Sequence, residues 1–262
     1  MIRVGVFGAA GRMGRTVCEA VASDPALELV AAVDPHHAGI DLRRVADVDS
    51  ALQVAASPDA LVDAGAEVVV DFTVADAARQ NIAFAAQHGL HAVVGTTGFT
   101  DADLAAIEAA FTESSCVVAA NFAIGAVLMM RFAELAAPWF ETVEIIELHH
   151  DTKIDAPSGT AMRTAERIAA ASSEWADDPT TTTVVEGARG GEGPGGIPIH
   201  SVRLRGLFAH QEVLLGTAGQ SLSIRHDTYD RTCFMPGVLL AVKHVAQRPG
   251  LTIGLEPLLD LG

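Results

Sequence analysis

Short apolar runs alternate with amphipathic stretches along the first 120 residues of the chain. Strands without polar alternation, each separated from the next by a helix, are typical of a parallel sheet covered on both faces. Because parallel crossovers are right-handed, the pattern predicts an α/β domain with a Rossmann-type doubly wound sheet. The predicted strands are Ile2–Phe7, Leu29–Val33, Val68–Phe72, Ala92–Gly95 and Cys116–Ala119, and the predicted helices are Met13–Ala22, Asp76–His88 and Asp101–Glu113.

After Asn121 the pattern changes. A helix is predicted over Ile124–Ala137, ending near Pro138, and strand-like alternation follows it. Strands grouped around one helix predict a second, α+β domain with a mixed, mostly antiparallel sheet. Its predicted strands are Val143–His150, Thr182–Glu186, Ser201–Arg205, Glu212–Gly216 and Ser221–His226, and its predicted helix is Thr160–Ser172.

Two segments complete the division of the chain. Gly187–Pro198 is too rich in Gly and Pro for either period, and a long mobile loop is predicted there. A helix pattern at Gly237–Gln247 returns to the style of the first domain. We therefore expect one domain from residues 1–122 and 234–262 and a second from residues 123–233.

The overall charge limits the partners. The 262-residue chain carries a formal charge of −16, so neither nucleic acid nor an anionic membrane is expected to bind it. Its mean hydropathy of +0.32 argues against disorder. The three cysteines lie far apart, without the spacing of a disulfide or zinc site. With no export signal and no spanning segment in the sequence, a cytoplasmic protein is expected.

A glycine loop follows the first predicted strand. The sequence Gly8-Ala-Ala-Gly11-Arg-Met-Gly14 leads directly into a helix pattern. Glycines at such a junction let the backbone approach a pyrophosphate, which is bound by free N–H groups at the helix N-terminus. Asp34 follows Gly14 by 20 residues and ends the second strand, where a carboxylate accepts hydrogen bonds from ribose hydroxyls. This register predicts a dinucleotide site rather than a plain tight turn.

The choice of dinucleotide depends on the residues around Asp34. A carboxylate repels a 2′-phosphate, and Pro35-His36-His37 supplies no arginine to offset it. NADH is therefore expected to bind at least as well as NADPH. Arg12 and Arg15 lie near the glycine loop and leave NADPH open.

Further cofactor contacts are expected at the carboxyl ends of later strands, where this fold binds ligands. Gly95-Thr-Thr-Gly98 follows the fourth strand and Ala119-Ala-Asn-Phe122 follows the fifth. Their small and hydroxyl side chains would let the nicotinamide half approach the backbone. Asp71-Phe72-Thr73, after the third strand, is a weaker candidate.

The segment from Glu147 to Thr160 carries the chemistry: ELHHDTKIDAPSGT. Pro157 at a helix start and Gly159-Thr160 in its first turn leave backbone N–H groups unpaired. These groups, the Thr160 hydroxyl and Lys153 suit a carboxylate. An imidazole and an ammonium nearby can supply a proton as a hydride arrives.

Alternative explanations exist for the same residues. Ser158 alone would be a helix cap, and Lys153 alone a solvated charge. His149 and His150 are adjacent on a strand and point to opposite faces, so a metal site is not expected. The cluster as a whole, beside a dinucleotide fold, favours a catalytic site.

Together these motifs resemble the 4-hydroxy-tetrahydrodipicolinate reductase (dihydrodipicolinate reductase) family over essentially the whole chain. The most specific match is Glu147-Leu-His-His150 with Lys153 and Asp155-Ala-Pro-Ser-Gly-Thr160, and the ending at 250–261 is similar to actinobacterial members. The resemblance implies reduction of a small cyclic dicarboxylate with loss of water, in the diaminopimelate route to lysine. It also implies a homotetramer, assembled through sheets of the second domain, that uses NADH or NADPH. The missing basic residue just after Asp34 departs from many relatives and puts a strong NADPH preference in doubt.

The resemblance also implies roles for individual residues. His149 would be the proton donor and acceptor, and Lys153 a second proton donor. The implied substrate contacts are His150, Lys153, Ser158, Gly159 and Thr160. The implied cofactor contacts are Gly8, Ala9, Ala10, Gly11, Arg12, Met13, Asp34, Gly95, Thr96, Thr97, Ala119, Ala120, Asn121 and Phe122.

Two other classes stay open at this point. One is a different two-domain dehydrogenase, acting on a semialdehyde or a hydroxy acid; an acyl-forming member would need a nucleophilic cysteine, and none lies in an obvious loop motif. The other is a regulator that binds NAD(H) without turnover. A regulator would leave His149 and Lys153 without purpose, and the acidic chain has no DNA-binding element.

Overall fold

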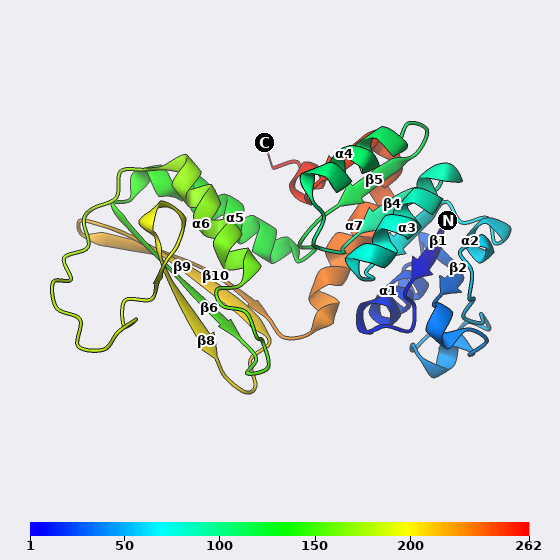
Figure 1. Cartoon of the computed structure of the whole chain (residues 1–262), viewed down its shortest axis with the longest axis horizontal. Helices are drawn as coiled ribbons and strands as arrows, with labels where there is room; N and C mark the ends of the chain where they lie inside the picture. The colour runs from blue at the N-terminus through cyan, green and yellow to red at the C-terminus, as the bar shows by residue number, and fades with distance from the viewer. Residues whose placement is uncertain (262) are drawn as a thin grey trace. The chain divides into compact units, whose positions relative to one another are not determined.

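The computed structural model describes residues 1–261 of the chain, which form two compact units (Figure 1). The first unit comprises Met1–Ile124 and the segment that starts at Arg231. The second unit is Gly125–Asp230. Each unit has its own sheet.

The first unit is built on a six-stranded parallel sheet in the order β11-β5-β4-β3-β1-β2. Its central strands contain Val residues that are almost completely buried, such as Val68–Val70 and Val93–Val94, as expected when helices cover both faces. The predicted doubly wound sheet is confirmed. The strands are β1 Ile2–Phe7, β2 Leu27–Val33, β3 Val68–Asp71, β4 His91–Val94, β5 Ser115–Val118 and β11 Gly250–Ile253.

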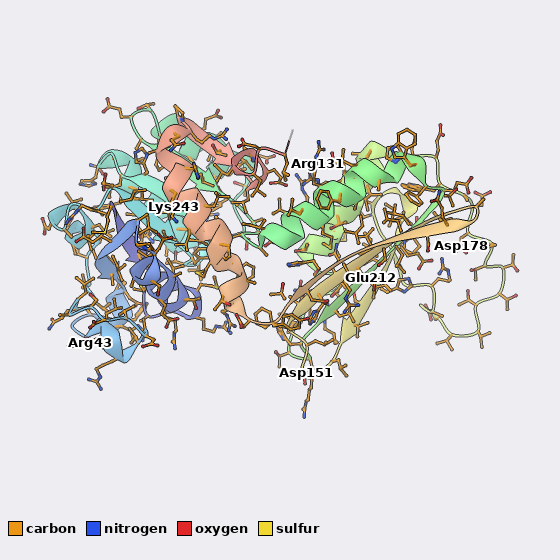
Figure 2. The ribbon with its side chains drawn as sticks, turned by 180° about the vertical axis from the view of Figure 1, so that it is seen from behind. Arg43, Arg131, Asp151, Asp178, Glu212 and Lys243 are labelled. Atoms are coloured by element: carbon orange, nitrogen blue, oxygen red, sulfur yellow. The ribbon has the colours of Figure 1, made fainter. Side chains whose placement is uncertain are left out.

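The helices of this unit pack in pairs. Helix α1 contacts α7, and α3 contacts α4. Lys243 of α7 donates a hydrogen bond of 2.5 Å to Asp24, which follows α1 (Figure 2). Arg79 of α3 binds both carboxylate oxygens of Asp103 in α4. The helices are α1 Arg12–Ser23, α2 Asp59–Asp63, α3 Ala75–Gln87, α4 Asp101–Ala110 and α7 Met235–His244.

The second unit contains a five-stranded sheet in the order β10-β9-β6-β8-β7. Strands β6 and β8 pair in parallel, and the other pairs are antiparallel, so the predicted mixed sheet is confirmed. Helix α6 packs on β6 through buried residues that include Ala165 and Ile168. The elements are α5 Ile124–Ala136, β6 Thr142–His149, α6 Gly159–Ala171, β7 Gly191–Glu192, β8 Pro198–Arg203, β9 Ala209–Thr217 and β10 Gln220–Thr228.

One predicted strand does not form, and some observed elements were not predicted. No strand forms at Thr182–Glu186, where Val184 and Val185 are exposed. β-Propensity needs a partner strand to act on, and this run of Thr and Val lies outside the sheet. The predicted loop Gly187–Pro198 contains the short strand β7 and a 3₁₀ turn at Pro194–Gly196. Strand β11, which pairs with β5, was not predicted; none of its four residues is buried, so it lacks the continuous apolar run that marks the other strands.

Candidate functional site

The glycine loop between β1 and α1 is shaped for a close approach of the backbone to a ligand. Gly8 has φ of +62°, a conformation that favours glycine. A Cβ on Gly14 would lie 2.0 Å from the carbonyl oxygen of Gly8, so the helix start can pack on the loop only without a side chain. Gly11 is the N-cap of α1, and no side chain caps the helix there. The first N–H groups of α1 are thus left for an anion such as a pyrophosphate.

Asp34 is attached to this loop. Its carboxylate is buried and accepts a hydrogen bond from the backbone N–H of Ala10 at 3.3 Å. The other oxygen accepts from the N–H of His36 and contacts Nδ1 of His37, both at 3.1 Å. The acid that follows β2 is therefore held beside the glycine loop, as a ribose-binding carboxylate requires.

A second carboxylate, that of Asp71, connects the loops that follow β3 and β4. Asp71 is 2% exposed, and its Oδ1 accepts hydrogen bonds from the N–H and hydroxyl of Thr73, each at 2.7 Å, and from Thr96 Oγ1 at 3.3 Å. Its Oδ2 accepts from Asn81 Nδ2 at 2.7 Å. The Thr96 hydroxyl also donates to the carbonyl of Thr73. The Thr96 hydroxyl is therefore already hydrogen-bonded within the protein, so a ligand would contact the backbone of Thr96 rather than its side chain.

Three predicted loops meet at the carboxyl ends of β3, β4 and β5. The ring of Phe72 packs against Phe122, with 5.5 Å between the centroids. The same ring fills the space next to Gly95. Ala119 and Phe122 are both about 1% exposed, and the Asn121 side chain accepts a hydrogen bond from the N–H of Ala123. The structure thus brings the loops after the third, fourth and fifth strands together.

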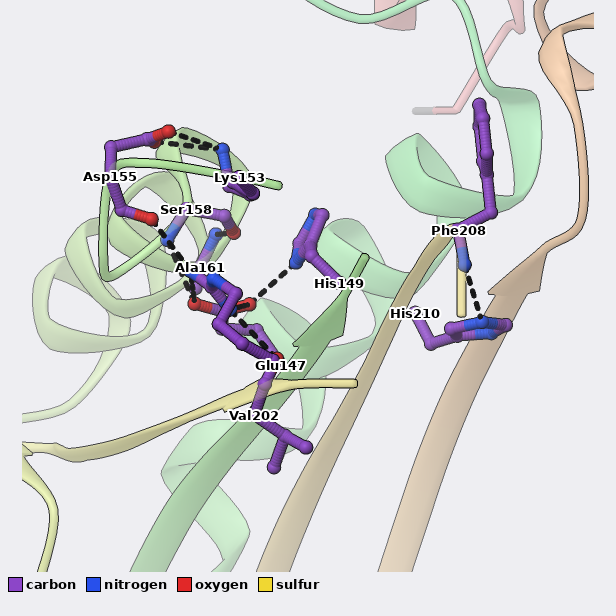
Figure 3. Close-up of polar contacts among 10 residues, drawn as sticks. Glu147, His149, Lys153, Asp155, Ser158, Ala161, Val202, Phe208 and His210 are labelled. Carbon is purple, nitrogen blue, oxygen red and sulfur yellow. Dashed lines mark hydrogen bonds and ion pairs between the residues drawn. The ribbon is translucent and has the colours of Figure 1, made fainter. Parts of the chain in front are cut away.

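In the second unit, Glu147 organises the end of β6 (Figure 3). Glu147 and His149 lie on the same face of the strand, and His149 Nδ1 is 2.5 Å from Glu147 Oε2. Arg203 of β8 binds both carboxylate oxygens at 2.8 Å. Burial alone would raise the pKa of the fully buried Glu147, but hydrogen bonds from His149 and Arg203 outweigh it and lower that pKa to about 2.

The same carboxylate reaches the start of α6. The backbone N–H of Ser158 donates to Glu147 Oε1 at 3.2 Å, and the Ser158 hydroxyl accepts from the N–H of Ala161 as the N-cap. Ser158 is buried, so its hydroxyl serves the helix. A Cβ built on Gly159 meets nothing within 4 Å, so the first turn of α6 is open beside that residue. Pro157 lies one residue before the cap, just outside the helix.

The loop between β6 and α6 carries the remaining candidates. Lys153 Nζ lies 2.8 Å from both carboxylate oxygens of Asp155, and its side chain is 19% exposed. The Asp155 carbonyl accepts from Arg203 Nη2 at 2.6 Å. His150 Nδ1 lies 2.7 Å from Thr152 Oγ1 in the same loop. His149, Lys153, Ser158 and the α6 N-terminus are thus linked, directly or through one residue, to the Glu147–Arg203 pair.

Sequence reasoning missed Arg203 and gave Glu147 no role. No local signal marks Arg203, because it ends a strand 56 residues after its partner.

In residues 1–261, no group of three or more His, Cys, Asp or Glu side chains is placed to hold a metal ion. No helix in that range has the length and apolar character needed to cross a membrane.

Known proteins match both units. The family model "Dihydrodipicolinate reductase, N-terminus" matches residues 2–122, and "Dihydrodipicolinate reductase, C-terminus" matches residues 125–259. A 4-hydroxy-tetrahydrodipicolinate reductase of Mycobacterium sp. (strain KMS) is 52% identical over 99% of this chain and 100% of its own length. The corresponding protein of Nocardia farcinica is 50% identical, with 99% of both chains covered.

Solved structures agree with this similarity. Dihydrodipicolinate reductase from Paenisporosarcina sp. TG-14, with dipicolinate bound, has a TM-score of 0.87 and 42% identity, and the match covers 98% of this chain and 99% of the other. An amine dehydrogenase from Mycobacterium smegmatis has a TM-score of 0.65 at 13% identity over 96% and 94% of the two chains. At that identity the second likeness concerns the fold alone.

Proposed function

The chain belongs to the dihydrodipicolinate reductase family, and on that premise we propose that it reduces 4-hydroxy-tetrahydrodipicolinate to tetrahydrodipicolinate. The reaction is an NAD(P)H-dependent step of the diaminopimelate pathway to lysine. A hydride adds to C4 of the ring, and the 4-hydroxyl leaves as water after taking up a proton. The protein must therefore bind two carboxylates and supply an acid.

The observation that carries this proposal is the cluster around Glu147. It places an imidazole and the open N-terminus of a helix around one anchored carboxylate, with an ammonium in the loop between them. A related reductase holds dipicolinate, a ring with two carboxylates, which supports a dicarboxylate for this chain as well.

We assign the steps to residues of this chain as follows. His149 donates the proton, and Lys153 is a second proton donor that also pairs with a substrate carboxylate. The backbone N–H groups at Gly159 and Thr160 bind a carboxylate at the positive end of α6. His150 contacts the substrate, and Ser158 acts by capping the helix that presents these groups.

The first unit is a Rossmann-type nucleotide-binding domain, and its residues fit a nicotinamide dinucleotide. When bound, NADH or NADPH supplies the hydride. We propose that dinucleotide binding belongs to residues 1–122 and 234–262, and substrate binding and assembly to 123–233. The proposed cofactor contacts are Gly8, Ala9, Ala10, Gly11, Arg12, Met13, Asp34, Gly95, Thr96, Thr97, Ala119, Ala120, Asn121 and Phe122.

A homotetramer assembled through the second sheet is part of the proposal. Leu214 of β9 is 37% exposed and lies on the same face of the sheet as Ile146 and Leu148 of β6, and an apolar sheet face that is not covered favours association. Light scattering of the purified protein tests this, and a monomer at micromolar concentration would contradict it. The cytoplasmic location expected from the sequence stays a prediction.

The thiols argue against an acyl-forming semialdehyde dehydrogenase. Burial raises the pKa of Cys18 to about 12 and raises that of Cys116 as well. Because the thiolate is the nucleophile, neither cysteine suits acyl transfer at neutral pH. Cys233 is partly buried in a 3₁₀ turn.

The test is cofactor oxidation by the purified protein. Substrate is generated in place from pyruvate and aspartate semialdehyde by a dihydrodipicolinate synthase, and NADH and NADPH are compared. We expect rapid oxidation only when the synthase is present, with NADH at least as effective as NADPH. Oxidation that starts on aspartate semialdehyde alone would favour the other dehydrogenase class, and binding without oxidation would favour a regulator.

A further inference from the structure

We propose that Glu147, clamped by Arg203, is a positioning residue that fixes the proton of His149 on Nδ1 and holds the imidazole in register with the α6 N-terminus. The role of this arrangement in turnover rests on the function proposed above. The arrangement itself is a statement about the folded protein and can be tested without substrate.

Both carboxylate oxygens of Glu147 accept hydrogen bonds. A hydrogen bond from the Ser201 side chain is one of the contacts that lower the pKa of Glu147. Oε2 contacts His149 Nδ1 at 2.5 Å and Arg203 Nη1 at 2.8 Å. Oε1 accepts from Arg203 Nη2 at 2.8 Å and from the N–H of Ser158 at 3.2 Å. The side chain is 0% exposed, so a buried charge is tolerated here because the guanidinium pairs with it in a bidentate manner.

This environment determines the tautomer of His149. An ionised carboxylate only accepts hydrogen bonds, and Glu147 is ionised because its pKa is lowered to about 2. The hydrogen between the two groups must therefore belong to Nδ1 of the imidazole. In the neutral ring Nε2 is then the unprotonated atom, and in the charged ring Nε2 carries the proton that can be given away.

The same pair sets the position of the other substrate groups. Ser158, whose N–H binds Glu147, is the N-cap of α6 and fixes where the helix begins. Arg203 also binds the carbonyl of Asp155, whose carboxylate holds Lys153. The Glu147–Arg203 ion pair therefore fixes the positions of His149, Lys153 and the first turn of α6 relative to one another.

The chain offers a matched control on the same strand. Glu144 also contacts a histidine and an arginine: its Oε2 is 2.6 Å from His200 Nε2, and its Oε1 is 2.7 Å from Arg189 Nη2. Glu144 is 31% exposed, and its bonds do not include the α6 cap. Glu144→Gln also removes a carboxylate charge that contacts a histidine and an arginine, but it changes no residue of the proposed site.

The first experiment needs no variant. In protein labelled with ¹⁵N-histidine, nitrogen chemical shifts distinguish the two neutral tautomers, and the His149 signals are assigned by their loss in His149→Gln. We expect neutral His149 to carry its proton on Nδ1, although free imidazole side chains prefer Nε2. A neutral ring protonated on Nε2 would overturn the proposal, whether or not the protein turns over substrate.

The second experiment uses Glu147→Gln, which keeps the shape and removes the charge. We expect a mixed tautomer signal for His149 and a kcat lowered by about 10- to 100-fold, the usual cost of removing a residue that orients a functional imidazole. Glu144→Gln should stay within about twofold of wild type on the same rate scale. An unchanged tautomer together with wild-type kcat in Glu147→Gln would refute the positioning role.

Arg203→Lys tests whether the positive charge of Arg203 is enough or whether the several N–H groups of its guanidinium are needed. The ammonium keeps a positive charge near Glu147 but cannot bind both oxygens and the Asp155 carbonyl together. We expect the His149 tautomer to persist in this variant while KM for substrate rises, because the loop and helix turn lose their shared anchor. An unchanged KM would contradict the role of Arg203 in positioning the loop and the first turn of α6.

Discussion

The ring of Phe72 occupies the space next to Gly95, so that a Cβ on Gly95 would lie 2.0 Å from Phe72 Cε1. Because Phe72 also packs against Phe122, a side chain on Gly95 would disturb the loops after β3, β4 and β5 together. This close packing makes glycine a requirement of the proposed nicotinamide-ribose region rather than a feature of a loose turn.

We therefore predict that Gly95→Ala weakens NADH binding at least tenfold and lowers unfolding stability by about 1–3 kcal/mol, the usual cost of overpacking. Gly191→Ala is the control, since its Cβ would meet its nearest neighbour at 3.9 Å. Fluorescence titration with NADH and urea unfolding measure the two effects. NADH affinity equal to wild type in Gly95→Ala would separate these loops from the cofactor.

The first five strands of the first unit were predictable from sequence because each contains a short run of buried apolar residues. A strand such as Val68–Asp71 begins with three consecutive buried valines. Local chemistry also revealed the glycine loop and the segment from Glu147 to Thr160. The Thr182–Glu186 prediction was wrong because propensity cannot show whether a partner strand exists.

The anchor of the site could not be predicted for a related reason. Arg203 meets Glu147 only because β6 and β8 pair in a parallel register that joins Leu148 to Val202. No spacing in a single sequence encodes that register. The same holds for Asp71, whose bonds to Asn81 and Thr96 span ten and 25 residues.

Asp34 provides the second prediction. Replacing it by Ala removes the proposed ribose acceptor and the carboxylate that would repel a 2′-phosphate. We expect NADH affinity to fall about 10- to 100-fold, as for a charge-assisted hydrogen bond, and NADPH affinity to fall less. Asp41→Asn is the control, because its bonds to Arg43 lie on the surface. Equal losses for both cofactors would argue that Asp34 only supports the loop through Ala10.

His149 provides the third. His149→Gln removes the proposed acid, and we expect kcat to fall 100-fold or more, with cofactor affinity unchanged. His200→Gln, which alters a histidine paired with Glu144 on the same sheet, should stay near wild-type activity. Normal turnover by His149→Gln in the coupled assay would remove His149 from the mechanism.

Lys153 provides the fourth. Its ammonium pairs with Asp155 and is proposed to pair with a substrate carboxylate, so Lys153→Ala should lower kcat and raise KM. Arg205→Ala is a nearby control, since Arg205 is 92% exposed and pairs with Asp151 in the loop after β6 (Figure 2). A KM equal to wild type in Lys153→Ala would contradict the carboxylate contact.

The fifth prediction concerns acid stability and follows from Glu147. Its pKa is lowered in the folded protein from 4.5 to about 2, so the folded state binds this proton less readily than the unfolded chain does. The resulting stabilisation, about 3 kcal/mol, is complete above pH of about 4.5 and is lost as pH falls towards about 2.

Glu147→Gln has no such titration but leaves the Arg203 charge buried without its partner. We expect the free energy of unfolding of the variant to lie about 3–5 kcal/mol below that of the wild type at neutral pH. This gap between the two proteins should narrow progressively as pH falls from about 4.5 towards about 2. Urea unfolding of both proteins at several pH values in that interval measures the gap. Glu166→Gln, which breaks an exposed pair with Arg163, should show a small gap at every pH. A Glu147→Gln gap that stayed constant through this interval would mean that folding does not lower the pKa of Glu147, and it would contradict the stabilisation of this carboxylate by His149 and Arg203.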